Sequence, residues 1–258
     1  MSQFSGWITA RRSYAFVLAN AREAFVVGAI WVVVLTAFRP VFFAIVGAFP
    51  TGSIDYGQLG WFFFITENLV FALAYAATAV AWHRLVLQQR RPSFIPAMSF
   101  ATVIYLSCLV ALFVVVWLSP FIGMAIFVST PSSESALTAV PMVIAFLLLA
   151  LVMRFALKLP AIAIDDRTMT FAEAWRRGRP LWPGLVWGAI VAYAPAFILA
   201  QMTSWLTYDL YLGSVVASTV MTVLYCAFTL IGMMLFATFL SLSYQFVVGD
   251  KGVGEVFA

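Results

Sequence analysis

Charged residues are scarce in this sequence. Asp, Glu, Lys and Arg make up 9% of the 258 positions, whereas roughly a quarter of the residues are charged in an ordinary soluble domain. Hydrophobic residues make up 64%. A soluble fold needs charged side chains on its surface, but a bilayer accepts an apolar exterior and requires only that backbone groups pair internally. The composition therefore excludes a soluble domain and predicts an integral membrane protein.

Histidine and cysteine are nearly absent, which limits the chemistry that the chain can perform. The only histidine, His83, adjoins Arg84 at the end of an apolar run, so we expect it to contact lipid headgroups or to fix topology. Cys108 and Cys226 both lie inside apolar runs without metal-site or disulfide spacing, and we interpret them as small hydrophobic residues. No phosphate-binding glycine loop or zinc-protease motif is present. The sequence thus predicts no enzyme activity, no metal and no cofactor.

Long apolar runs are what the sequence does contain. A helix needs about 20 mostly apolar residues to cross the hydrocarbon core, and six runs reach that length. They cover approximately residues 24–48, 61–82, 99–127, 139–157, 183–205 and 214–246. We predict an all-α polytopic bundle with one domain over 1–258, six transmembrane helices arranged as three hairpins, and short cytoplasmic amphipathic helices. The third and sixth helices are long enough to tilt or to project from the membrane.

Basic residues fall on one side of this arrangement. The connectors PTGSIDYGQLG, STPSSESALT and LTYDLYLG contain no Lys or Arg, and each contains one acid: Asp55, Glu134 and Asp209 respectively. Thirteen of the fourteen basic residues lie in the opposite set of segments. The positive-inside rule then predicts that both termini are cytoplasmic. Tryptophans near the predicted helix ends fit interfacial aromatic belts; these are Trp61, Trp82, Trp117, Trp182 and Trp205.

Two cytoplasmic segments have the pattern of interfacial helices. Residues 4–22 mix apolar and basic side chains, so we expect them to lie on the inner leaflet. Residues 171–179 follow Thr170 and Glu173, which have capping-box spacing, and precede Pro180, which is expected to stop the helix. We predict lipid-headgroup contacts for Arg84, Arg90, Arg91, Arg176, Arg177 and Arg179. The alternative is that these residues only fix topology. The basic residues are too dispersed to bind nucleic acid.

One basic residue lies inside a predicted span. Arg39 precedes Pro40 in the first helix, and Glu67 lies about two turns into the second helix from the outer side. An unpaired arginine at a helix centre costs roughly 2.5 to 3.5 kcal/mol or more, so we expect a partner, a water-filled cavity or a side chain that reaches toward the surface. We predict an intramembrane ion pair between Arg39 and Glu67. The pair is expected to serve as a structural clamp between two helices, as the polar lining of an outward-facing funnel, or as part of an ion or proton path.

Small residues and prolines suggest where the helices pack and bend. Pro40, Pro120 and Pro195 are expected to kink their helices. Gly184 and Gly188 have the four-residue spacing that allows close helix approach, which we interpret as packing within the chain rather than as a dimer contact. The hairpins 20–97, 98–180 and 181–258 are similar in length. This leaves a threefold internal repeat as a hypothesis.

The segment RFALKLPAIAIDDRTMTFAEAWRRGRPLW, from Arg154 to Trp182, resembles bacterial six-helix proteins of the YciC-like group and the membrane domain attached to some glycerophosphodiester phosphodiesterases. The resemblance rests on residues 159–175 and the six-span layout, and Arg39 and Glu67 depart from it. It implies a bacterial inner-membrane protein with an accessory or envelope-related role, and it transfers no catalytic residues.

Three functional hypotheses follow. The first is a membrane accessory or scaffold protein that packs against lipid, another membrane protein or itself. The second is a small transporter or channel whose path is lined by Arg39 and Glu67. The third is an enzyme acting on lipid at the cytoplasmic face through Asp165, Asp166, His83 and the cytoplasmic arginines. The two adjacent acids are otherwise expected to be solvated or to cap a helix. A clustering of these groups at one cavity mouth would favour catalysis, and wide separation would exclude it.

Overall fold

The computed structural model is α-helical, and the part that it describes contains no strand. This confirms the predicted fold class at the level of an all-helical membrane protein. The described residues are 4–47, 56–93, 99–117, 143–144, 147–148, 150–211 and 215–249.

Four helices are long and apolar enough to cross a bilayer, as far as the described residues extend. They are α2 (Ala21–Gly47), α3 (Tyr56–Gln88), α9 (Trp182–Tyr211) and α10 (Val215–Val248). They correspond to the predicted first, second, fifth and sixth spans. Each is longer than its predicted apolar run, because helical hydrogen bonding continues into the less apolar residues at its ends.

The predicted third and fourth spans are described only in part. Helix α4 (Phe100–Trp117) covers residues 100–117 of the predicted span 99–127, and residues 143–144, 147–148 and 150–155 are helical within the predicted span 139–157. Residues 118–127, 139–142, 145–146 and 149 of these two predicted spans lie outside the described part of the chain. The six-span layout therefore stays a prediction.

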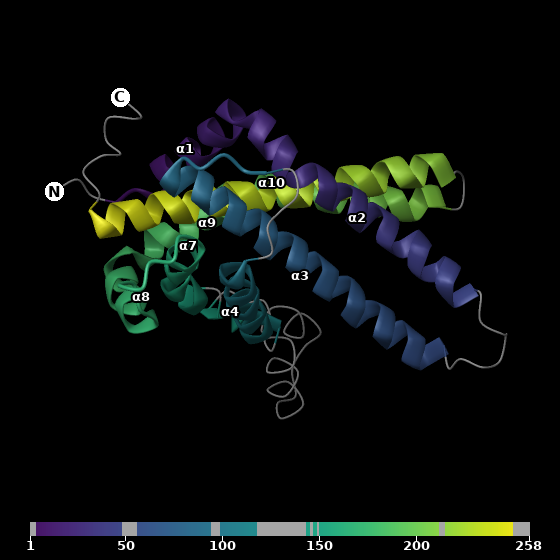
Figure 1. Cartoon of the computed structure of the whole chain (residues 1–258), viewed down its shortest axis with the longest axis horizontal. Helices are drawn as coiled ribbons and strands as arrows, with labels where there is room; N and C mark the ends of the chain where they lie inside the picture. The colour runs from purple at the N-terminus through teal and green to yellow at the C-terminus, as the bar shows by residue number, and fades with distance from the viewer. Residues whose placement is uncertain are drawn as a thin grey trace.

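Helix α10 lies at the centre of the bundle and contacts α9, α3, α2 and α1 along its length (Figure 1). Its 34 residues span about 51 Å at 1.5 Å per residue, which exceeds the roughly 30 Å of the hydrocarbon core. Leu230, Met234, Phe239 and Leu240 on α10 are almost fully buried. A helix of this length is long enough to project beyond the bilayer or to tilt within it, and either arrangement stays a prediction for the sixth span.

The N-terminal helix α1 (Gly6–Ala19) packs on α9 and α10. Its buried face consists of small residues, among them Gly6, Ala10 and Ser13, whereas Trp7 and Leu18 are exposed. Phe4 contacts Phe246 near the end of α10, with ring centroids 5.3 Å apart. The expected helix is present in residues 4–22, but one face of it is bound to the bundle.

Glycine permits this close approach. A Cβ on Gly6 would lie 2.0 Å from the Gly184 carbonyl oxygen, and a Cβ on Gly188 would lie 2.7 Å from the Gly6 oxygen. Neither distance is possible for a real side chain. The Gly184 and Gly188 pair thus packs against α1 within the chain, as predicted.

A proline in α9 explains a second contact with α1. Pro195 has no N–H, so it cannot donate to the carbonyl of Val191 four residues earlier. The Tyr14 hydroxyl donates to this carbonyl at 2.8 Å and also lies 3.1 Å from the Ala192 oxygen. Burial raises the pKa of the Tyr14 phenol above 10.0, so the hydroxyl is protonated at neutral pH. Helix α1 thereby provides a hydrogen-bond donor to the Val191 carbonyl, which has no helical N–H partner in α9.

Candidate functional site at the basic end of the bundle

One end of the bundle holds most of the described basic residues, and we call it the basic end. It comprises the end of α3, the start of α4, helices α7 (Lys158–Ala163) and α8 (Phe171–Gly178), the start of α9 and the end of α10. The short 3-10 turn η1 (Arg179–Leu181) connects α8 to α9. Pro180 lies in this turn, so it ends α8 without ending the helical course of the chain.

Five side chains form a buried polar cluster between α3, α4 and α10: Trp82, His83, Tyr105, Thr238 and Ser241. The Trp82 indole donates to Thr238 Oγ1 at 2.7 Å. His83 Nδ1 lies 2.7 Å from Ser241 Oγ, and His83 Nε2 lies 3.1 Å from the Tyr105 hydroxyl. Polar groups inside a membrane bundle stabilise it only when they are paired across helices. The cluster therefore holds three helices in one fixed arrangement.

The position of His83 corrects two predictions. His83 and Trp82 are both 0% exposed, so His83 does not contact headgroups and Trp82 does not belong to an interfacial belt. A serine hydroxyl beside an imidazole is the geometry of an activated nucleophile. Here Ser241 is buried as well, and Tyr105 occupies the second ring nitrogen. The arrangement joins α3, α4 and α10 through paired polar groups.

The two adjacent acids make different contacts. Asp165 has a φ of +60°, in the left-handed region, and its carboxylate lies 3.8 Å from Arg84. Asp166 accepts hydrogen bonds from Thr168 N–H at 2.8 Å, from Thr168 Oγ1 at 2.7 Å, and from the Tyr244 hydroxyl of α10. Asp166 was expected to be solvated or to cap a helix, whereas it connects the loop 164–170 to the end of α10.

The pKa of the Asp166 carboxyl is lowered from its ordinary value of 3.8. Partial burial raises it, but the hydrogen bonds from Tyr244 and Thr168 and the charge of Lys158 together outweigh burial. Lys158 itself donates to the Met169 carbonyl at 2.6 Å. The loop 164–170 is thus bound through the Asp166 carboxylate on one side and through the Lys158 ammonium on the other.

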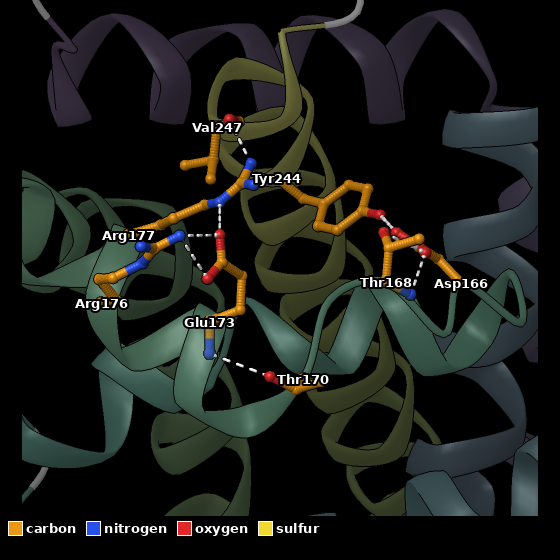
Figure 2. Close-up of polar contacts among 8 residues, drawn as sticks. All are labelled: Asp166, Thr168, Thr170, Glu173, Arg176, Arg177, Tyr244 and Val247. Atoms are coloured by element: carbon orange, nitrogen blue, oxygen red, sulfur yellow. Dashed lines mark hydrogen bonds and ion pairs between the residues drawn. The ribbon is translucent and has the colours of Figure 1, made fainter.

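Helix α8 docks on the same end of α10 (Figure 2). Thr170 caps it by accepting from the Glu173 N–H at 3.1 Å, as predicted. The Glu173 carboxylate does not complete the capping box but binds Arg176 at 2.8 Å and also Arg177. Arg177 then donates to the Val247 carbonyl at 3.2 Å. A cation at this position satisfies a carbonyl that the end of α10 leaves unpaired.

The arginines predicted to contact headgroups divide into two groups. Arg84 is mostly buried, and its Nε donates to the Ala163 carbonyl at 2.7 Å, which binds α3 to α7. The others are exposed, so their headgroup contacts stay a prediction; they are Arg90, Arg91, Arg176, Arg177 and Arg179. Arg90 and Arg91 follow Gln89, whose φ of +52° ends α3.

The predicted intramembrane ion pair lies at the other end of α2 and α3. Phe38 stacks on Phe63 with centroids 6.0 Å apart, so the two helices are side by side in this region. Glu67 is partly buried on α3. The Arg39 side chain lies outside the described part of the structure, and its pairing with Glu67 stays a prediction.

Sequence reasoning missed Tyr14, Tyr105, Ser241 and Tyr244. A signal for Ser241 exists, because Thr238, Ser241 and Gln245 are spaced by three and four residues and form a polar stripe on one side of an otherwise apolar helix. The tyrosines carry no comparable signal. Neither Cys108 nor Cys226 forms a disulfide, as predicted, and the described residues contain no cluster of three metal-binding side chains.

No protein-family model matches this chain, and no curated protein or solved structure shows significant similarity to it.

Proposed function

We propose that this chain is a non-enzymatic integral membrane protein of the bacterial inner membrane. It acts as an accessory or scaffold in membrane or envelope organisation, and it binds lipid, another membrane protein or a second copy of itself. The observation that carries this proposal is the use of polar groups at the basic end. His83, Ser241 and Arg84 bind helices to one another, and the surface of the spanning helices is left apolar.

The outer surface fits a role in contact with lipid and protein. Trp61, Trp187, Trp205 and Val216 are each more than half exposed on the spanning helices. In the most apolar stretch of α2 only 18% of the residues are buried inside the bundle, whereas in that of α10 the share is 61%. In lipid such surfaces are satisfied without a partner, and they also provide area for a neighbouring helix.

We also propose the six-span layout with both termini in the cytoplasm. Phe4 touches Phe246, so the start of α1 and the end of α10 lie at the same end of the bundle, as an even number of crossings requires. The described arginines concentrate at this end, which supports a cytoplasmic location. The resemblance to YciC-like proteins is consistent with this role.

Site-specific photo-crosslinking in native membranes tests the scaffold proposal. A photoreactive residue replaces Trp187 or Trp205 on the surface, and the same residue at the buried position Tyr105 is the control. We expect a discrete adduct with one protein or a second copy at a surface position, or retention of one lipid class above its share of the membrane. The absence of protein adduct, self-adduct and lipid enrichment would refute the proposal.

A transport function is the second candidate, and one observation favours it. Within the part of the chain that the structure describes, the Trp31 indole nitrogen and the Thr36 and Thr78 hydroxyls are buried on α2 and α3 without a hydrogen-bond partner. Unpaired polar groups at membrane depth are the kind of groups that line an aqueous path. The test is ion and proton flux in reconstituted vesicles. Unchanged flux in both Arg39→Gln and Glu67→Gln would exclude the predicted ion pair from the path.

A further inference from the structure

Arg154 is held between aromatic rings at the basic end. It lies in the helical stretch 150–155, and its guanidinium carbon is 4.7 Å from the centroid of the Trp175 ring and 5.8 Å from that of Trp182. Phe155 stacks on Trp175 with centroids 4.9 Å apart. These contacts fix the position of the cation, because a guanidinium is attracted to the faces of aromatic rings.

The charge of Arg154 has no carboxylate partner among the described residues. Glu173 is bound by Arg176 and Arg177, and Asp165 lies beside Arg84. Cation–π contacts leave the N–H donors at the edge of a guanidinium available. A part-buried cation with open donors fits an anion that comes from outside the chain.

The surroundings of Arg154 are closely packed on one side and exposed on the other. A Cβ on Gly178 would lie 2.9 Å from the Arg154 carbonyl oxygen, so the end of α8 touches the backbone of Arg154. Spacings of four and three residues place three side chains on one face of the continuous helical segment formed by α8, η1 and the start of α9: Trp175, Arg179 and Trp182. Arg179 is exposed and Trp182 is 38% exposed.

We propose that Arg154, together with Arg179, binds the phosphate of an anionic phospholipid at the basic end, with Trp175 and Trp182 at the rim of the site. This inference rests on the proposed function, since it names the lipid class that the scaffold binds. A guanidinium pairs with phosphate through two parallel hydrogen bonds, tryptophans are enriched at headgroup level, and basic pockets between helices bind anionic headgroups.

Titration with phosphatidylglycerol in phosphatidylcholine nanodiscs tests the site. The readouts are quenching of tryptophan fluorescence by headgroup-spin-labelled phosphatidylglycerol and the phosphatidylglycerol retained in native mass spectrometry. We expect Arg154→Gln to weaken the apparent affinity about tenfold, the effect of losing a charge-assisted hydrogen bond. Arg154→Lys keeps the positive charge but loses the two parallel N–H donors of the guanidinium, so we expect an affinity between those of the wild-type protein and Arg154→Gln. Arg167→Gln is the matched control, because it removes the same charge from an exposed loop residue.

The outcomes separate this inference from the proposed function. Equal losses in Arg154→Gln and Arg167→Gln would show a non-specific charge effect and would overturn the site. Competition by inorganic phosphate at concentrations similar to those of the lipid would assign the site to free phosphate and would also overturn it. If the wild-type protein prefers phosphatidylglycerol but no Arg154 variant changes this, only the site fails. If the wild-type protein shows no preference for phosphatidylglycerol, both the site and the proposed binding of lipid by the scaffold are refuted. Circular dichroism identifies a variant that does not fold, and Arg154→Lys then decides.

Discussion

The contact between Tyr14 and the proline-interrupted helix α9 leads to a quantitative prediction. Replacement of Tyr14 by Phe removes the hydroxyl that donates to the Val191 carbonyl at 2.8 Å and leaves the ring in place. The carbonyl cannot recover a helical partner, because residue 195 is proline and has no N–H. In lipid or in a protein interior, water is not available to replace the lost donor.

The expected cost follows from the measured range for such contacts. Hydrogen bonds between membrane helices contribute roughly 0.6 kcal/mol on average and at most about 1.7 kcal/mol. A buried group that loses its partner costs about 1 to 3 kcal/mol. Since the contact is part-buried, we expect Tyr14→Phe to lower the free energy of unfolding by about 1 to 2 kcal/mol.

A double-mutant cycle with Pro195→Ala isolates this effect. Alanine at position 195 restores the N–H, so the Val191 carbonyl regains its donor within α9. Tyr14→Phe should then cost less in the Pro195→Ala background than in the wild-type protein, with a coupling energy of about 1 kcal/mol. The measurement is equilibrium unfolding in mixed micelles with increasing dodecyl sulfate, followed by circular dichroism.

Equal costs of Tyr14→Phe in the two backgrounds would refute the reasoning, because the hydroxyl would then contribute independently of the missing N–H. A Tyr14→Phe variant as stable as the wild-type protein would show that the contact contributes nothing to α1 docking.

Three further predictions concern the basic end and the N-terminal helix. Ser241→Ala leaves one ring nitrogen of the buried His83 without its partner and should cost about 1 to 3 kcal/mol in the same unfolding assay; no loss of stability would show that the contact is not stabilising. Gly6→Ala places a Cβ 2.0 Å from a backbone oxygen of α9 and should detach α1, seen as faster proteolysis near the N-terminus, whereas α1 should stay protected in Ala15→Ser at an exposed position. The lowered pKa of Asp166 means that its ionised form stabilises the docked loop 164–170, so this contribution is complete well above pH 3.8, declines as the pH falls below that value and is lost below the folded-state pKa. Hydrogen exchange of the loop should increase over this range, and Tyr244→Phe should reduce the pH dependence; an unchanged dependence would rule out the contact as its source.

The sequence indicated the spanning helices because their signal is local. A run of about 20 apolar residues predicts a membrane helix whatever its neighbours are, and α2, α3, α9 and α10 appeared at the predicted places. The cap of α8 was also predictable, since Thr170 and the Glu173 N–H are only three residues apart. The interpretation of Gly184 and Gly188 as packing within the chain was confirmed by their contact with Gly6.

The polar contacts were not predictable in the same way. His83 was expected at the membrane surface because it follows an apolar run and precedes Arg84. It is buried because Tyr105 and Ser241, 22 and 158 residues away in the chain, provide its partners. Glu173 was expected to complete a capping box, but its carboxylate binds Arg176 and Arg177, which follow it by about one turn. In both cases a competing partner decided the outcome, and local spacing does not reveal such a partner.

The sequence by itself thus determined membrane residence, the helical class and the approximate position of four spans, since these depend on apolar content summed over each run. The tertiary structure decided which polar groups are consumed inside the bundle and which remain at its surface. Arg84 and Arg154 illustrate the difference: both are arginines at the basic end, but one binds a carbonyl of α7 and the other lies between tryptophans. Only helix packing determines which donors and acceptors meet across distant parts of the chain.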